Sequence, residues 1–541
     1  MDVALRRILP LLAVVAGCGD KTEATDAGDD VEAGLEADAE LDAGDGEDAA
    51  VEDARAEDAP FWPDGGVDVR FPDGFLWGTA SAAYQVEGRE DPDGGTVASN
   101  WSEWEDQDHI VGHVRSGAGA GFWDLYEEDL DRAAALGNNA VRLGVEWARI
   151  EPAEGVWDDE ALGHYVAVVQ AARARGMVVF LTLYHWVVPT WVQSPVARID
   201  LVSEASDAFA DAFEAFVRHV VPAFAADVDF WIPLNEPFSV VSAGYLSGDH
   251  PPGGLLDMEG AMQAGMNFIF AHARAAAAIR ELDLADADGD GDPASIGNAA
   301  VANEFPPKNA ADPDDVFASE RIGYIVNDVF PEAWTSGNLD VNMDGDFEDV
   351  DTSPPEGFYA ELAGTLDWIG INYYGPGAAE GGSFARIEPL RGLPLLAVDR
   401  YDAALPHNEM GREINAPSFL LTLRRYASWG LPLYITENGI ADAADEQRGF
   451  YLLEHLRVLG MAIGEGIDVR GYLHWSLTDN FEWAYGFTQR FGLYAVDFAD
   501  AGLARTERGS AALFRQVIAA GGIDDGMWSA WALERYPSDG R

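Results

Sequence analysis

Strand patterns and helix patterns alternate eight times along this chain from about residue 69, and this alternation limits the fold more than any other feature. Strands joined by helices run parallel, and they either close into a barrel or form an open doubly wound sheet. No glycine-rich phosphate-binding turn follows the first strand, so the open sheet is the weaker alternative. The sequence therefore predicts an α/β fold, a single (β/α)8 TIM barrel. Its strands are expected at residues 75–81, 140–146, 178–184, 230–234, 295–302, 368–372, 433–436 and 471–477.

Helical patterns separate these strands, and no second domain-sized insertion interrupts them. In TIM barrels the functional residues gather at the carboxyl ends of the strands. Seven polar or aromatic residues are expected at or near such ends: Trp77, Glu146, His185, Glu236, Tyr374, Glu437 and Trp475. Clear helical patterns cover residues 122–136, 161–175, 205–225, 260–282, 418–429 and 447–464.

Two of these residues, Glu236 and Glu437, each close an apolar run that is typical of a buried strand. A charge in that place is costly unless it is used, although most glutamates that follow a strand are ordinary surface charges. Asn-Glu-Pro at 235–237 and Thr-Glu-Asn-Gly at 436–439 add amides beside each acid and residues that set the chain direction. A pair of carboxylates is what cleavage of a glycosidic bond requires, so the pair indicates an enzyme.

The formal net charge of −62, from 95 acidic and 33 basic residues, argues against nucleic-acid partners and against docking on anionic lipid. It also disfavours an acidic polysaccharide as substrate, whereas a neutral glycoside is compatible with it. The 17 tryptophans suit a large core and stacking on sugar rings. Cys18 is the only cysteine, so neither an intramolecular disulfide nor a cysteine-based zinc site can form.

The first 17 residues have the layout of a secretory signal, because Arg6 and Arg7 precede an apolar stretch at residues 8–16. The stretch is too short for a permanent transmembrane helix. Val-Ala-Gly-Cys at 15–18 resembles the bacterial lipobox, in which the cysteine is lipidated and becomes the new N-terminus. We therefore predict a lipoprotein signal peptide at residues 1–17 and an exported, cell-envelope protein that contacts the membrane only through a lipid anchor on Cys18. An ordinary signal peptide cleaved nearby is the alternative.

Residues 19–60 contain no aromatic side chain and consist mainly of Asp, Glu, Ala and Gly. Such a segment cannot bury enough apolar surface to offset the entropy of ordering it. The sequence therefore predicts a disordered acidic tether at residues 18–67 and a catalytic barrel domain at residues 68–535.

Several motifs in order make the chain similar to glycoside hydrolase family 1, the β-glucosidase family, from about residue 71 to residue 505. Phe-Pro-Asp-Gly-Phe-Leu-Trp-Gly-Thr-Ala at 71–80 and Tyr-Gln-Val-Glu-Gly at 84–88 resemble the family's N-terminal signature, and the two glutamate motifs resemble its catalytic motifs. The resemblance implies that Glu236 is the general acid/base and Glu437 the nucleophile of a retaining β-glycosidase. The enzyme would hydrolyse terminal non-reducing β-D-glucosyl residues of small glycosides or oligosaccharides through a two-step glycosyl-enzyme mechanism.

A retaining mechanism places the two carboxyl groups about 5 Å apart, with the nucleophile ionised and the acid protonated. The resemblance implies three residues that support the nucleophile: Arg142 beside it, Tyr374 hydrogen-bonded to it and Asn372 in the same site. A structural ion pair is the alternative role for Arg142, and a core position is the usual one for an isolated tyrosine.

Sugar recognition needs hydrogen-bonding groups around the hydroxyls and an aromatic face beneath the ring. The residues that match the family's sugar-binding residues are Gln85, His185, Asn235, Trp475, Glu482 and Trp483. His185 has no second histidine or cysteine at metal-ligand spacing. The loop after Trp483 offers no lysine, so we expect an unphosphorylated small-molecule glycoside as the substrate.

One motif outside the site resembles a calcium-binding loop. Oxygen ligands stand at its first, third, fifth and twelfth places and glycine at its sixth, in a run that includes Asp340, Asn342, Asp344, Asp346 and Asp351. A poorer copy covers residues 286–292. We expect catalysis to need no cofactor, and any calcium bound here to be structural.

Two other functions are open at this point. A carbohydrate-binding protein on an inactive barrel is disfavoured, since such a protein has no reason to keep Glu236, Glu437, Arg142 and Tyr374 together. A related enzyme acting on β-galactosides or β-fucosides, or catalysing glycosyl transfer, would share the residues around the sugar.

Overall fold

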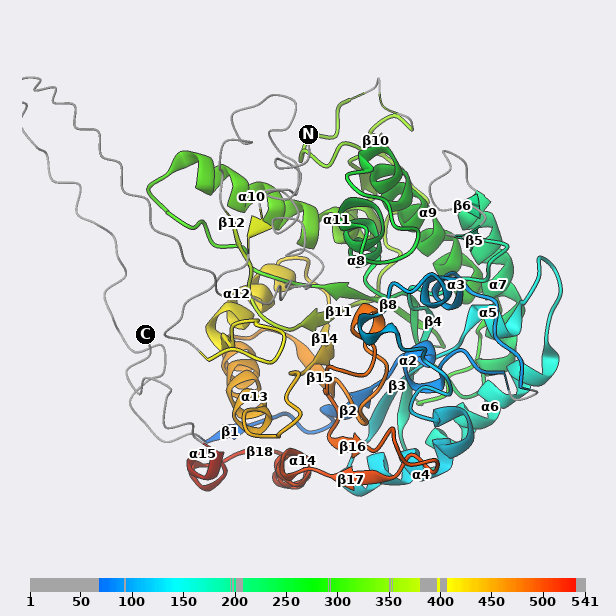
Figure 1. Ribbon diagram of the computed structural model, residues 1–541. Helices are drawn as coiled ribbons and strands as arrows, with labels where there is room; N and C mark the ends of the chain where they lie inside the picture. The colour runs from blue at the N-terminus through cyan, green and yellow to red at the C-terminus, as the bar shows by residue number, and fades with distance from the viewer. Residues whose placement is uncertain are drawn as a thin grey trace, which may run out of the picture.

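Eight parallel strands close into a barrel in the computed structural model (Figure 1), as the alternating pattern predicts. Around the barrel the order is β11, β14, β15, β2, β3, β4, β7 and β8, and every neighbouring pair is parallel. The structure describes residues 68–91, 94–194, 196, 199–200, 208–289, 291, 293–349, 352, 354–379, 397–398 and 406–531. The predicted signal peptide and tether lie outside these residues. The barrel strands are β2 Leu76–Ala80, β3 Ala140–Gly144, β4 Val178–Tyr184, β7 Phe230–Leu234, β8 Ser295–Val301, β11 Trp368–Tyr373, β14 Leu433–Asn438 and β15 Val469–His474.

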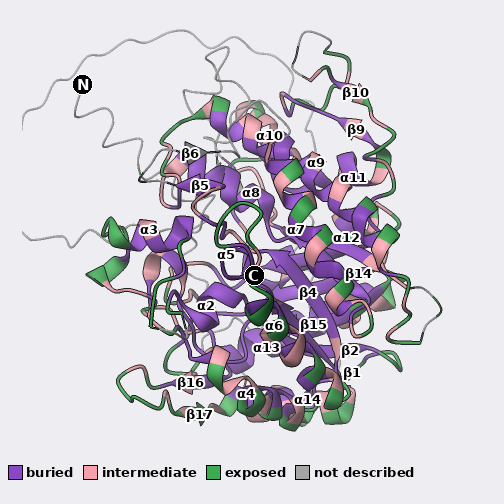
Figure 2. Cartoon of the chain, turned by 90° about the vertical axis from the view of Figure 1, so that its right-hand side faces the viewer, coloured by how far each residue is buried: buried purple, intermediate pink, exposed green. Residues whose placement is uncertain are grey.

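Helices connect successive strands and surround the barrel, with their exposed faces turned outward (Figure 2). In α7, apolar residues at helical spacing, including Phe209, Phe213, Phe216 and Val220, are fully buried, so this face drives the helix onto the barrel. The connecting helices are α4 Phe122–Leu136, α6 Asp159–Ala174, α7 Ala208–Phe224, α9 Met258–Leu282, α10 Pro313–Asn327, α11 Val329–Ser336, α12 Ala416–Ala427, α13 Arg448–Gly464 and α14 Gly509–Ala520.

Short elements decorate this frame. The helical ones are α2 Ala83–Glu87, α3 Asn100–Asp106, η1 Val111–His113, α5 Trp147–Ile150, α8 Pro237–Val240, the π-helix η2 Val241–Ser247, η4 Trp483–Tyr485 and α15 Asp525–Trp531. The paired short strands are β1 Val69–Arg70 with β18 Gly522–Ile523, β5 Gln193–Ser194 with β6 Ile199–Asp200, β9 Asn338–Leu339 with β10 Gly357–Phe358, β12 Ala378–Ala379 with β13 Ala397–Val398, and β16 Tyr494–Val496 with β17 Arg505–Glu507. No helix among the described residues combines the length and apolarity that crossing a membrane requires.

Large aromatic side chains fill the barrel interior. The rings of Phe180 and Phe230 lie 4.4 Å apart, and those of Trp368 and Tyr434 lie 5.2 Å apart. Gly297 makes room for this packing, because a Cβ at that position would meet the Trp368 ring at 2.3 Å. The interior is therefore a packed core, and a ligand can enter only at an end of the barrel.

Two strands differ from the expected positions, β2 at Trp77 and β14 at its carboxyl end. Trp77 is the second residue of β2, at the amino end of the strand, and packs against Phe71, Phe75 and Phe514. Its expected place at the carboxyl end was wrong, because an apolar run does not mark where pairing begins. Strand β14 continues through Glu437 to Asn438, with a register shift that sets Asn372 opposite Glu437. Irregular pairing of this kind re-aims a side chain at the rim of a barrel.

Candidate active site

A pocket of about 1200 Å³, counting its open mouth, lies at the carboxyl ends of the barrel strands. The two glutamates and seven of the nine other residues singled out in the sequence line it, including Gln85, which the short helix α2 carries after β2. Arg142 and Asn372 do not line the pocket, because both are fully buried directly behind the carboxylates. The lining members of that set are Gln85, His185, Asn235, Glu236, Tyr374, Glu437, Trp475, Glu482 and Trp483.

Glu437 is held by donors on both carboxylate oxygens. Arg142 Nη1 donates to Oε1 at 2.5 Å, and the Tyr374 hydroxyl donates to Oε2 at 2.6 Å. Burial and the neighbouring Glu437 charge raise the pKa of Tyr374 well above its ordinary value, so its hydroxyl keeps its proton. Burial raises the pKa of Glu437 as well, but the Arg142 charge and these hydrogen bonds counteract that rise. The contacts therefore favour the ionised form of Glu437.

Glu236 has neutral partners instead. Its Oε2 accepts from the Ser239 hydroxyl at 2.7 Å, and its Oε1 accepts from Asn372 Nδ2 at 2.7 Å. Burial, and then the charge of Glu437, raise the pKa of Glu236 to about 7. The surroundings of the two carboxyl groups thus favour different protonation states, which is the arrangement that general acid catalysis beside a nucleophile needs.

The backbone at Glu236 is strained. Its φ of 43° and ψ of 59° place it in the left-handed region, and its N–H donates to the Ala299 carbonyl at 2.8 Å. For a residue with a Cβ this conformation costs on the order of 1–3 kcal/mol. Pro237 follows at once and begins α8, so the chain turns sharply just as it leaves the strand.

Two buried asparagines join the acids into one network. Asn235 Oδ1 accepts from Arg142 Nη2 at 2.6 Å and from Asn372 Nδ2 at 3.1 Å. Asn372 also hydrogen-bonds toward Glu437 and lowers its pKa, so one amide is within reach of both carboxyl groups. The Thr436 hydroxyl fixes the orientation of Asn372 by donating to its Oδ1 at 2.7 Å.

The predicted sugar-binding residues face the acids across the pocket. His185 Nε2 lies 3.0 Å from Asn235 Nδ2, and burial together with the Arg142 charge lowers the pKa of His185 well below its ordinary value. Its imidazole is therefore neutral. Gln85 Nε2 donates to Glu482 Oε2 at 3.1 Å. Burial, followed by the charge of Glu437, raises the pKa of Glu482 to about 8.

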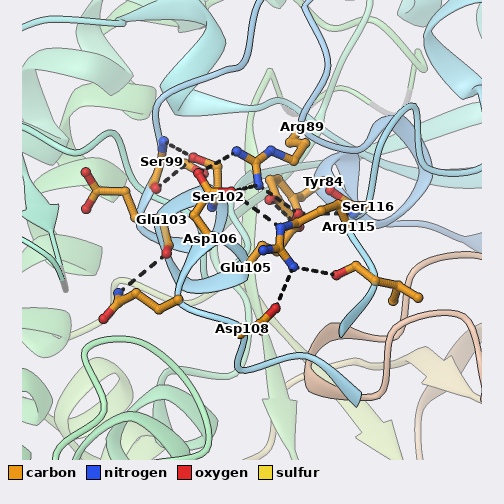
Figure 3. A network of polar contacts seen from close by, with 12 residues as sticks. Tyr84, Arg89, Ser99, Ser102, Glu103, Glu105, Asp106, Asp108, Arg115 and Ser116 are labelled. Carbon is orange, nitrogen blue, oxygen red and sulfur yellow. Dashed lines mark hydrogen bonds and ion pairs between the residues drawn. The ribbon is translucent and has the colours of Figure 1, made fainter. Parts of the chain in front are cut away.

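A polar network braces one wall of the pocket (Figure 3). Glu105 is fully buried and accepts hydrogen bonds from the Tyr84 hydroxyl at 2.7 Å and from Arg89 at 3.2 Å. The ring of Tyr84 is parallel to that of Trp483, with centroids 6.1 Å apart, and the next residue is Gln85. The network thus positions two predicted sugar-binding residues through one helix.

Sequence reasoning missed several lining residues. Trp186 follows His185 directly, and its Nε1 donates to the Asn235 carbonyl at 3.2 Å. Its position next to a predicted sugar-binding residue is the one sequence feature that could have indicated it. The others come from loops with no motif to single them out, and only the fold brings them to the pocket. They include His250, Asn303, Phe305, Met410, Arg412, Tyr485 and Phe491. Glu146 lies near a strand end as expected, two residues after β3, but it does not line the pocket and accepts from the Ala148 N–H at the start of α5.

The described part of the predicted calcium loop does not gather its carboxylates. Asp340 accepts from the N–H groups of Asp344 and Gly345 and from the Tyr324 hydroxyl, and Asp346 N donates to Asp344. Asp351 lies outside the described residues. Among the described residues, the three carboxylates that do approach within 4.8 Å are those of Asp229, Asp286 and Asp288, in and beside the poorer copy of the motif.

Comparisons with known proteins agree with this geometry. The model of glycosyl hydrolase family 1 matches residues 67–523. The chain is 30% identical over 482 residues to beta-glucosidase A of Thermotoga maritima, covering 84% of this chain and 99% of the relative. It is 31% identical over 521 residues to a beta-galactosidase of Pyrococcus woesei, covering 84% and 98%. A solved family 1 β-glucosidase of Thermotoga maritima superimposes with a TM-score of 0.73 at 29% identity, covering 85% of this chain and all of that one.

Proposed function

Because the chain belongs to glycosyl hydrolase family 1 and is a retaining β-glycosidase, we propose that it releases terminal non-reducing β-D-glucosyl residues from small glycosides or oligosaccharides. The observation that carries the proposal is the difference between the hydrogen-bond partners of the two acids. Glu437 accepts from the Arg142 cation and the Tyr374 phenol, whereas Glu236 accepts only from the neutral side chains of Ser239 and Asn372.

In the first step, the Glu437 carboxylate attacks the anomeric carbon while Glu236 gives its proton to the departing glycosidic oxygen. The bond between the anomeric carbon and that oxygen breaks, and an ester between the sugar and Glu437 forms. In the second step, Glu236 takes a proton from water as the water oxygen attacks the same carbon, and the ester bond between that carbon and Glu437 breaks, which releases Glu437 as a carboxylate. The sugar leaves with its original anomeric configuration, and both carboxyl groups return to their starting states.

The pocket supports this change of role. The charge of Glu437 contributes to the raised pKa of Glu236. When Glu437 becomes an ester it loses that charge, so the pKa of Glu236 falls and its carboxylate is ready to act as a base. Glu236 is therefore an acid before the first step and a base after it.

Cleavage of β-galactosides is the second candidate, because relatives that are 31% and 33% identical carry the name beta-galactosidase. The sugar's 4-hydroxyl would be equatorial in one substrate and axial in the other, and the family resemblance gives both sugars the same binding residues. Glycosyl transfer would use the same intermediate with a sugar in place of water.

A panel of nitrophenyl glycosides on the purified enzyme tests the proposal. We expect the highest kcat/KM on the β-D-glucoside, lower values on the β-D-galactoside and β-D-fucoside, and none on α-glycosides. A β-galactoside preference would replace the proposed sugar, and α-glycoside cleavage without β-activity would overturn the proposal altogether.

Two further features of the chain are proposed on sequence grounds alone. We propose export and a lipid anchor at Cys18, from the arginine-flanked apolar stretch and the lipobox-like run. We also propose that calcium, if bound by the loop from Asp340 to Asp351, stabilises that loop and takes no part in catalysis.

A further inference from the structure

Arg412 places a guanidinium in the wall of the active-site pocket. It lies on the segment between β13 and α12, whose backbone is fixed by a pair of hydrogen bonds with Asn408. Asn408 N donates to the Arg412 carbonyl at 2.9 Å, and Arg412 N donates to Asn408 Oδ1 at 2.9 Å. The Arg412 side chain therefore projects from an anchored turn, and the residue is half-buried in the pocket wall.

This guanidinium makes no hydrogen bond or ion pair with the residues that the structure describes. It lies over the Tyr374 ring, at 5.9 Å from the centroid, near the outer limit of a cation–π interaction. In a chain with 95 acidic and 33 basic residues, a cation without a carboxylate partner is unusual. By contrast, the neighbouring guanidinium of Arg425 is bidentate on Asp328, at 2.9 and 2.6 Å.

The balance of charge inside the pocket depends on Arg412. Among the described lining residues it is the only lysine or arginine, beside the three carboxyl groups of Glu236, Glu437 and Glu482. Arg142 is paired with Glu437, and the charge of Arg412 lowers the pKa of Glu482 against the larger effect of burial. Arg412 thus acts on Glu482 through its charge and forms no hydrogen bond or ion pair with the described lining residues, so its guanidinium donors are open to a group on a bound ligand.

The surroundings indicate which part of a substrate would meet this charge. The predicted sugar-binding residues come from α2 and from the loops after β4, β7 and β15, whereas Arg412 belongs to a different segment. The pocket residues outside the sugar-binding set are largely apolar and include Phe238, Val301, Phe305, Met410 and Phe491. An apolar wall with one guanidinium suits a leaving group that has an apolar body and a single anionic substituent.

We propose that Arg412 is a specificity-determining residue that binds a carboxylate on the leaving group of the glycoside. This inference rests on the proposed function and names the class of leaving group that the enzyme selects. A guanidinium can donate two parallel hydrogen bonds to a carboxylate, which a lysine cannot. The net charge of −62 slows the approach of an anion, but salt screens that repulsion beyond about 8 Å at physiological ionic strength, whereas the pair inside the pocket is screened less. Neutral glycosides remain substrates.

The test compares two aryl β-D-glucosides of the same shape, 4-carboxyphenyl and 4-carbamoylphenyl β-D-glucoside. The variants are Arg412→Gln, Arg412→Lys and, as control, Arg470→Gln, which removes the same charge at the exposed amino end of β15. In Arg412→Gln we expect kcat/KM for the carboxylate to fall roughly tenfold, mainly through KM, with less than a twofold change for the amide. Arg412→Lys should lose part of the preference, and Arg470→Gln should retain it.

In Arg412→Gln, an unchanged ratio of the two kcat/KM values would overturn the proposal. If both values fall equally, Arg412 acts on a shared part of the reaction, such as the ionisation of Glu482; if neither falls, Arg412 has no role with these substrates. Cleavage of the amide by the wild-type enzyme supports the proposed function by itself, so a failure of Arg412 selectivity is distinguishable from a failure of the glucosidase assignment. If neither glucoside is cleaved, both proposals fail.

Discussion

Arg142 and Glu437 are 295 positions apart in the chain and form a fully buried ion pair of 2.5 Å at the rim of the barrel. The Arg142 guanidinium also donates to Thr182 on β4 and to Asn235 just after β7, so it links these two strands to Glu437 on β14. A buried charge is stable only with such partners. The pair therefore couples the stability of the barrel rim to the ionisation of the residue that we assign as nucleophile.

Replacing Arg142 should change the acidic limb of the pH–rate profile. Arg142→Met removes the cation that favours ionised Glu437, so the pKa of Glu437 rises and activity is lost at a higher pH than in wild type. It also leaves a buried charge unpaired, at a cost of about 3–5 kcal/mol of unfolding free energy. Arg142→Lys, the matched control, should keep the acidic limb near its wild-type position. If the acidic limb does not move in Arg142→Met, Arg142 does not control the ionisation of Glu437.

Removal of the Glu437 carboxylate should abolish hydrolysis. In Glu437→Gly or Glu437→Ala the anomeric carbon has no nucleophile on its open face, and the space left admits a small anion. Added azide or formate should then restore turnover, with the product in the inverted configuration, as followed by proton NMR. Near-normal activity without the anion would assign the nucleophile elsewhere.

The Glu236→Ala variant should depend strongly on the leaving group. Without the acid, a poor leaving group lacks its proton, so alkyl β-glucosides should slow by about 10²–10⁴-fold. Activated aryl glucosides, such as the dinitrophenyl compound, need no proton and should retain most of their first-step rate. Steady-state and burst kinetics on both substrates measure the difference. A uniform loss across leaving groups would point to a role in folding or binding.

On the alkaline side, kcat/KM for an unactivated glucoside should fall as pH rises through about 7, the raised pKa of Glu236. The sign follows from the role: above that pH Glu236 has lost the proton that it must donate. The limb should disappear in Glu236→Ala assayed on an activated substrate. If it persists there, it belongs to another group in the coupled set, for which Glu482 is the nearest choice because its pKa is raised to about 8.

Calcium should raise the melting temperature if the loop beginning at Asp340 binds it. Binding to the folded state alone stabilises it by mass action, so the shift should grow with calcium concentration and vanish with chelator and in Asp344→Ala. Glu320→Gln, which removes an exposed charge on α10 outside the loop, is the control. kcat on a small glucoside should stay constant below the melting range. If the melting temperature does not change with calcium concentration, the loop does not bind calcium and is an ordinary acidic turn.

Much of the barrel could be predicted from the sequence, because buried parallel strands are nearly continuous apolar runs. All eight strands were predicted within a few residues, and the helices were displaced mainly at their ends. Trp77 shows the limit of such patterns: it belongs to an apolar run, but which end of the strand it occupies depends on pairing with β3 and β15. Residues of the pocket also differ in how far the sequence indicates them. Glu236 and Glu437 stood in recognisable motifs, whereas Met410 and Arg412 stood in none.

By itself the sequence determined the alternation of elements, the barrel, the family and the identity of two acids, because each of these is written in residues close together along the chain. Only the tertiary structure decided what surrounds each acid. Arg142 comes from β3, whereas Asn372 and Tyr374 come from the carboxyl end of β11, and their distances to the two acids follow from strand register and from the irregular pairing of β11 with β14. Protonation depends on burial and on charges within a few ångströms, and no local pattern encodes those quantities. For that reason the motifs predict which residue is the acid and which the nucleophile, but the physical difference between Glu236 and Glu437 is visible only in the folded chain.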